Sequence, residues 1–185
     1  FDPKGDADLL TMMYVEAQKV NRPFYMFHLG FPEYSCRYNP IGDYSRITEV
    51  ATRIANQLPS DGQSAAFRDF VWRFVNVLAK TMEALSIKPN YMNIYKSAAN
   101  IDDLAGQFFI LILDREFPNW KAGYDQFEMP ESEQKTATKT GRNLDTMKLG
   151  SYLKSKNYSE SLIDALNGIL SNDRSYFEKL VSSLY

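Results

Sequence analysis

Apolar residues recur at helical spacing through most of the chain after residue 44. The pattern is clearest in residues 64–85, where an apolar side chain returns every three or four positions. That spacing places the apolar side chains on one face of a helix, and we expect this helix to organise the core. Similar but shorter patterns predict further helices in residues 45–58, 92–99, 101–115, 144–156, 159–170 and 173–184. Residues 131–140 are polar and threonine-rich, and they predict a mobile stretch instead.

The first 44 residues have a different pattern. Phe1 is followed by Asp-Pro-Lys-Gly-Asp, which is typical of a strand that ends in a turn, because proline cannot continue a ladder and glycine permits unusual backbone angles. Residues 7–20 have helical spacing, and the apolar run at 24–27 predicts a short strand. Two short strands cannot complete a sheet by themselves. We therefore expect the remainder of the sheet to lie outside this sequence.

These patterns predict a mainly α protein with two parts. Residues 45–185 form a multi-helix, all-α domain. Residues 1–44 form a small strand–helix–strand segment of α/β type and a connecting loop punctuated by glycine and proline. Because the first residue is Phe instead of Met, we expect the chain to be a segment of a longer protein.

Composition narrows the classes of function. The chain has 185 residues, 44% of them hydrophobic, which is enough for a core without disulfides. The net charge of -2 excludes binding of nucleic acid through the charge of the whole chain. Cys36 is the single cysteine and His28 the single histidine, so a structural zinc site within the chain lacks ligands. No apolar run reaches the roughly 18 residues that a membrane span needs.

No complete catalytic motif is present. The sequence contains no GxxxxGK[ST] phosphate loop, no GxSxG nucleophile elbow and no HExxH pair. We therefore expect that this chain is not an enzyme and needs no cofactor or metal. One alternative remains open: a small helical enzyme of unrelated type, with a site built from the dispersed acids Asp102, Asp103 and Asp114. Acids near a helix N-terminus also favour the helix dipole, so the first two have a structural explanation.

Two groups of residues are candidates for binding. The turn that carries Asp2, Lys4 and Asp6 could form the rim of a phosphate site, although a capped turn uses the same residue types. The second group combines basic side chains with an aromatic one in residues 135–156, and it could contact single-stranded DNA or a partner protein. A solvated helix face is the alternative for this second group. Its members are Lys135, Lys139, Arg142, Lys148, Tyr152, Lys154 and Lys156.

Several motifs resemble one family, the TraD/TraG-like coupling proteins of conjugative type IV secretion systems. They are DPKGD at 2–6, RYNPI at 37–41, EVATRIA at 49–55 and FRDFVW at 67–72, with the predicted strand at 24–27 between the first two. The resemblance covers residues 1–115 by motif, and the remainder by position and helical character.

The resemblance implies a parent protein that is a homohexameric, RecA-like ATPase at the bacterial inner membrane. With ATP and Mg²⁺, such a parent moves single-stranded DNA and its attached relaxase. Its Walker A loop would precede Phe1 and its Walker B strand would follow Tyr185, so we expect no ATP hydrolysis by this chain. Asp2, Lys4 and Asp6 would lie near the nucleotide site. The all-α domain would face the cytoplasm and recognise relaxosome proteins, DNA or other secretion components, or would serve as a spacer in the hexamer.

Overall fold

The computed structural model describes residues 5–59 and 64–172, and the chain divides into two compact units, residues 1–38 and 39–185. The sequence pattern predicted a boundary after residue 44, six residues later than the boundary in the structure. Residues 39–44 belong with the helices because Ile41 is fully buried there. The Asn39 amide also donates to the Pro89 carbonyl at 2.8 Å, and Arg53 donates to the carbonyls of Pro40 and Asp43.

Over the described residues the chain forms nine helices and no strand, which confirms the mainly α prediction. The structure places helices at all the predicted positions up to residue 170. The helices are α1 (Ala7–Lys19), α2 (Thr48–Ala55), α3 (Ser64–Ala84), α4 (Tyr91–Ala99), α5 (Ile101–Glu116), α6 (Trp120–Gln126), α7 (Glu131–Thr140), α8 (Leu144–Ser155) and α9 (Ser161–Leu170). The helix predicted for residues 173–184 lies outside the described residues.

The N-terminal unit corrects the predicted α/β segment. Its helix α1 forms, but residues 24–27 lie in no ladder. This stretch is held by a hydrogen bond from the Cys36 N–H to the Met26 carbonyl at 2.7 Å. A strand needs a row of such bonds with a neighbouring strand, and residues 5–38 supply no second strand. The other predicted strand, at Phe1, lies outside the described residues.

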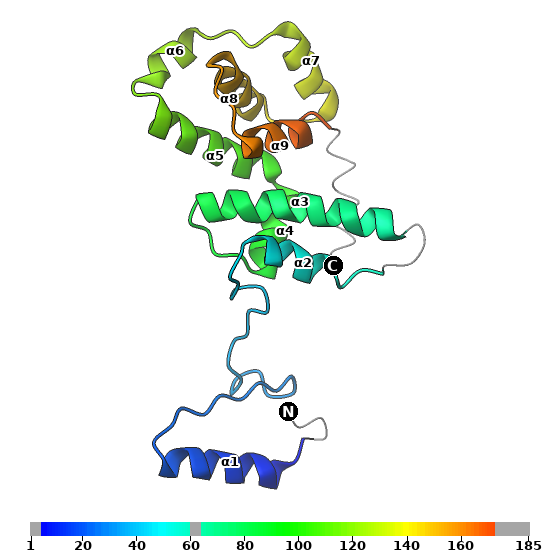
Figure 1. The fold of residues 1–185 in the computed structure, drawn as a ribbon, viewed down its shortest axis with the longest axis vertical. Helices are drawn as coiled ribbons and strands as arrows, with labels where there is room; N and C mark the ends of the chain where they lie inside the picture. The colour runs from blue at the N-terminus through cyan, green and yellow to red at the C-terminus, as the bar shows by residue number, and fades with distance from the viewer. Residues whose placement is uncertain (1–4, 60–63, 173–185) are drawn as a thin grey trace. The chain divides into compact units, whose positions relative to one another are not determined.

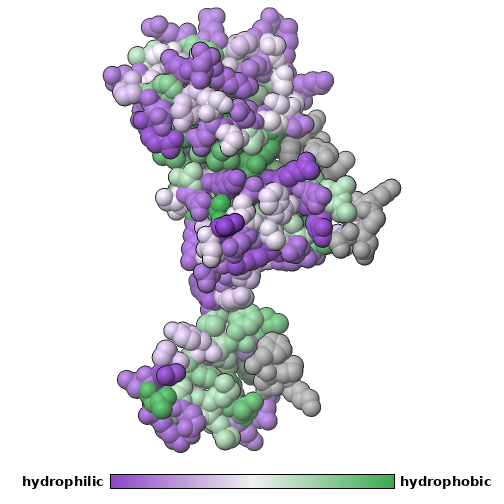
Figure 2. Space-filling view, in the orientation of Figure 1, coloured by the Kyte–Doolittle hydropathy of each residue, from purple (hydrophilic) through white to green (hydrophobic). Residues whose placement is uncertain are grey.

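Apolar side chains cover much of the visible surface of the N-terminal unit, whereas polar residues dominate the helical unit in the same view (Figure 2). None of the described residues in 5–38 is buried, and α1 buries no side chain. Met12 is 66% exposed and Leu29 is 87% exposed. The unit therefore has an apolar surface but no core of its own.

The helical unit is built around α3, as its apolar pattern predicts. Helices α2 and α4 lie on one side of α3, and α5 and α9 lie on the other (Figure 1). On α3 itself, Val71, Phe74, Leu78 and Met82 are buried, whereas Phe67 is 39% exposed. The core continues through α5, whose Phe108 and Phe109 are almost completely enclosed. The predicted face of α3 thus points inward except at its first turn.

Residues 131–140 form helix α7, although their polarity predicted a mobile stretch. The helix packs against α8, and its one buried residue, Ala137, is completely enclosed. The first turn carries Glu131 and Glu133, which favour the positive end of the helix dipole. Gly141 then ends the helix in the left-handed conformation, with φ of 67°.

Among the helices in residues 5–59 and 64–172, none combines the length and the apolar character that crossing a bilayer requires.

Candidate functional site

A buried ion pair fixes the beginning of α5. Asp102 lies in the first turn of α5 and Arg142 in the turn between α7 and α8, and each residue is 6% exposed. Their Oδ2 and Nη1 atoms are 3.1 Å apart. The second carboxylate oxygen of Asp102 accepts the Asn143 N–H at 2.9 Å, and its backbone carbonyl accepts the Thr146 hydroxyl at 3.1 Å. These extra bonds offset part of the desolvation cost of burying two charges.

The other donors of Arg142 bind the end of α9. Its Nε and Nη2 atoms donate to the Asn172 carbonyl at 3.2 and 3.1 Å, and Nη2 also donates to the Ile169 carbonyl at 3.3 Å. Carbonyls in the last turn of a helix lack partners within that helix, so a guanidinium is well suited to them. We call this arrangement the Arg142 staple. It joins α5, the α7–α8 turn and α9.

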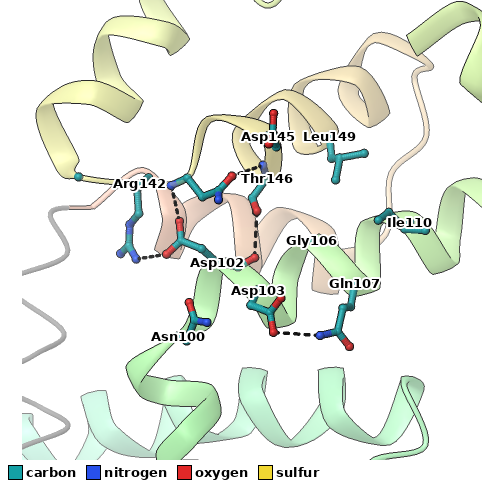
Figure 3. A pocket seen from close by; sticks show the side chains of 12 residues that line it. Asn100, Asp102, Asp103, Gly106, Gln107, Ile110, Arg142, Asp145, Thr146 and Leu149 are labelled. Carbon is teal, nitrogen blue, oxygen red and sulfur yellow. Dashed lines mark hydrogen bonds and ion pairs between the residues drawn. The ribbon is translucent and has the colours of Figure 1, made fainter. Parts of the chain in front are cut away.

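A groove of about 510 Å³ opens beside the staple, between α5 and α8 (Figure 3). Asp103, Gln107 and Ile110 line it from α5, and Asp145 and Leu149 line it from α8. We call it the α5–α8 groove. The turns that bury Asp102 and Thr146 leave their neighbours Asp103 and Asp145 exposed on the walls of the groove.

The close approach of the two helices depends on a glycine at the centre of the groove. A Cβ atom added to Gly106 would lie 3.1 Å from the hydroxyl oxygen of Thr146. That distance is tighter than an ordinary van der Waals contact, so a larger residue would push α8 away. Gly106 therefore permits the close approach of α5 and α8 at this point.

The groove carries excess negative charge. Asp102 is neutralised by Arg142, but neither Asp103 nor Asp145 forms an ion pair within the described part of the chain. Asp103 instead accepts a hydrogen bond from the Gln107 side chain at 3.0 Å. Two exposed carboxylates on opposite walls favour a positively charged ligand.

The structure does not gather the three acids of the alternative enzyme site. Asp102 and Asp103 line the groove, whereas Asp114 lies near the other end of α5 and accepts the Trp120 indole N–H at 2.7 Å. Residues 5–59 and 64–172 contain no cluster of three or more metal-ligating side chains. A general acid and a general base must both reach the reacting atoms. Asp114 is too far along α5 to act with the other two, and both carboxylate oxygens of Asp102 are engaged by Arg142 and Asn143.

The candidate basic group is divided by the fold. Lys135, Lys139 and Lys154 are exposed on α7 and α8, and we call them the α7–α8 lysines. Lys135 lies 2.7 Å from Glu131, and Lys154 lies 3.7 Å from Glu133. Acids on the same surface therefore offset much of this positive charge.

Two further lysines lie over aromatic rings. The Lys148 Nζ is 4.5 Å from the centre of the Tyr124 ring, and the Lys156 Nζ is 4.7 Å from that of Tyr152. Such contacts are weakly attractive cation–π interactions. The Lys148 contact thus bridges α8 to α6, whereas the Lys156 contact lies within α8 and its C-terminal cap.

Arg142 and Tyr152 do not belong to a solvent-facing contact surface in this structure. The guanidinium of Arg142 is engaged in the staple. Tyr152 is 3% exposed, and its hydroxyl donates to the Trp120 carbonyl at 3.1 Å. Its ring packs against those of Trp120, Tyr124 and Phe127, so it cannot stack on a nucleobase.

The N-terminal candidates are only partly described. Asp2 and Lys4 lie outside the described residues. The Asp6 carboxylate caps α1 by accepting the N–H groups of Asp8 and Leu9 at 2.9 and 3.1 Å. This is the bonding expected of a capped turn.

The groove residues Gln107, Ile110 and Asp145 were missed from the sequence. Helical spacing assigns a residue to a face of its own helix, but it cannot say which two helices meet. The usable signal was the pair Asp102–Asp103 at the start of α5, which points one carboxylate inward and the next outward.

Comparisons with known proteins gave no match: no family model fits the chain, and no curated protein or solved structure was found to be similar. Its function has to be inferred from its own residues and their geometry.

Proposed function

We propose that this chain is the recognition domain of a conjugative coupling ATPase and docks DNA-processing proteins onto the motor. The motifs at 2–6, 37–41, 49–55 and 67–72 support the family. The separation of a helical unit that has its own core from an N-terminal unit that has none supports a domain joined to a larger body. In this proposal the homohexameric parent binds ATP and Mg²⁺ at the inner membrane, and the helical unit faces the cytoplasm.

A protein partner fits the surface better than bare DNA does, and the pairing of the α7–α8 lysines with acids is the observation that carries this choice. A surface that binds DNA releases counterions from many phosphates and therefore needs unopposed cations. Here Glu131 and Glu133 lie beside Lys135 and Lys154. Mixed charges of this kind are common at the polar rim of protein interfaces.

The alternative of an unrelated helical enzyme has less support. Asp102 is committed to the Arg142 staple, Asp114 binds Trp120, and only Asp103 of the three is exposed toward the groove. A catalytic carboxylate needs access to its substrate. The observed bonding gives two of the three acids structural roles.

The proposal is tested by immobilising the chain and measuring retention of purified relaxosome proteins from the conjugative element that carries its gene. We expect retention of at least one of them at about 0.15 M salt. We also expect a labelled single-stranded oligonucleotide to bind weakly or not at all under those conditions. Retention of none of the proteins would contradict the proposal, and tight oligonucleotide binding would favour a DNA-binding role.

A pair of triple variants localises the contact. Lys135→Ala, Lys139→Ala and Lys154→Ala together should weaken retention of the partner. Lys19→Ala, Lys80→Ala and Lys88→Ala remove the same charge from other exposed positions and should leave retention unchanged. Equal losses in the two triple variants would show a general effect of charge instead of a defined surface.

A further inference from the structure

Two hollows adjoin along α5 and share the lining residues Asn100, Asp103 and Gln107. The first is the α5–α8 groove. The second, of about 410 Å³, is lined by Ile87 and Leu104 together with polar side chains, among them Lys96 at the part of the hollow away from α8. We call the two hollows together the double groove. Because they share three lining residues, one extended polypeptide segment could contact both.

The chemistry changes along this double groove. The α5–α8 groove is lined by the carboxylates of Asp103 and Asp145. The side chain of Ile110 on α5 also lines it and is partly exposed to solvent. Arginine and lysine combine an apolar stem with a charged end, so they can cover Ile110 and reach a carboxylate. The second hollow instead favours an apolar side chain, since burial of apolar area is stabilising.

We propose that the double groove binds an extended segment of a partner protein that carries basic side chains in the α5–α8 groove and an apolar side chain in the second hollow. The inference rests on the proposed function, because it names the chemistry by which a docked protein is recognised. It also assigns a second surface, distinct from the α7–α8 lysines. The staple keeps both walls of the groove in place without occupying Asp103 or Asp145.

Other ligands fit less well. Nucleic acid would bring phosphates toward Asp103 and Asp145, where like charges repel. A divalent metal ion prefers several oxygen ligands around one point, and the described residues hold no cluster of three candidate ligands. A basic segment needs only one carboxylate for each cation, and the two walls of the groove supply that arrangement.

The probe is a fluorescein-labelled octapeptide of alternating arginine and leucine, compared with the same peptide in which glutamine replaces arginine. Fluorescence anisotropy with the full chain should show binding of the arginine peptide about tenfold tighter or more, a ratio that one charge-assisted hydrogen bond can supply. The affinity should fall as salt rises. Equal affinities for the two peptides, or no binding by either, would overturn the inference.

Variants place the peptide on the chain. Asp103→Asn with Asp145→Asn should reduce affinity about tenfold or more, and Ile110→Arg should do the same by repulsion while remaining compatible with an exposed position. Asp69→Asn with Asp125→Asn removes two exposed carboxylates elsewhere and serves as the matched control. Amide NMR adds the location, since Gly106, Gln107 and Gly141 should shift on titration of the arginine peptide. Equal losses in the two double variants, or shifts confined to other residues, would refute the site.

The groove and the proposed function can fail separately. If a relaxosome protein is retained equally by wild type and by Asp103→Asn/Asp145→Asn, the double groove is not its binding site and the proposed function stands. If no relaxosome protein is retained but the arginine peptide still binds in a groove-dependent way, the function is wrong and the groove stands.

Discussion

The two units contain similar kinds of apolar side chain but use them differently. In the helical unit, Leu78, Phe108 and Phe109 are enclosed by side chains from several helices. In the N-terminal unit, α1 is the only helix within residues 5–38, and none of its side chains is buried. Apolar content therefore stabilises a fold only where several segments present complementary faces. The N-terminal unit has apolar residues suited to a core, but within residues 5–38 no second helix or sheet packs against them.

The largest expected difference between the units lies in amide hydrogen exchange. Amides of α5 should exchange only through global unfolding, whereas amides of α1 should exchange through local opening at a free energy close to zero. The difference in protection should reach about 5 kcal/mol, since that is the lower range of domain stability. Measurement by NMR or mass spectrometry decides it. Equal protection in α1 and α5 would break the comparison.

Two alanine substitutions, one in each unit, should show the same difference in stability. Phe109→Ala removes a fully buried ring and should lower the free energy of unfolding by about 3 to 5 kcal/mol. Tyr14→Ala removes a ring that is 51% exposed on α1 and should change it by less than about 1 kcal/mol. Urea denaturation followed by circular dichroism measures both. A loss of similar size in the two variants would mean that α1 shares the core.

Replacement of Arg142 by lysine tests a polar contribution to the helical unit. Lysine keeps the positive charge near Asp102 but cannot reproduce the fork that binds the carbonyls of Ile169 and Asn172. We expect a loss of about 1.5 to 3 kcal/mol in the free energy of unfolding. Arg73→Lys, at an exposed position on α3, is the control and should cost almost nothing. A stable Arg142→Lys variant would show that the charge alone is sufficient.

The smallest expected effect is the alkaline behaviour of Tyr124. Partial burial and then the nearby charges of Asp145 and Asp125 raise the pKa of its phenol above the ordinary value of 10.0. The unfolded chain therefore loses this proton first as pH rises, so the contribution to stability is complete below about pH 10 and is lost as pH rises through the folded pKa. Ultraviolet difference titration should place Tyr124 above the exposed tyrosines, and Asp145→Asn should lower its pKa. A pKa unchanged by that substitution would show that Asp145 does not contribute to the shift.

The sequence predicted the helices well because their apolar side chains keep a period close to 3.6 residues over several turns. Helices α6 and α7 were missed, because each has only one buried residue, Trp120 and Ala137 respectively, which is too little for an apolar pattern. The strand at residues 24–27 was predicted from its composition, but a strand is defined by its partner, and none is present in residues 5–38.

The candidate site was less predictable for a related reason. Arg142 and Asp102 are 40 residues apart, and no local pattern indicates that two charges will be buried together. Tyr152 was interpreted as a surface residue because basic residues surround it in the sequence. Its spacing from Leu149, which is also buried, was the better guide to its orientation.

The Arg142 staple also determines how the helical unit would respond to tension. A pull on the backbone at Asn172 acts directly on a carbonyl that Arg142 holds, and Arg142 in turn grips Asp102 at the start of α5. Part of such a load would therefore pass to α5 through Arg142, in parallel with the covalent path through α9. If the domain docks cargo onto a motor as proposed, this connection would carry force to α5 and to the turn that leads into α8, the two helices that line the α5–α8 groove.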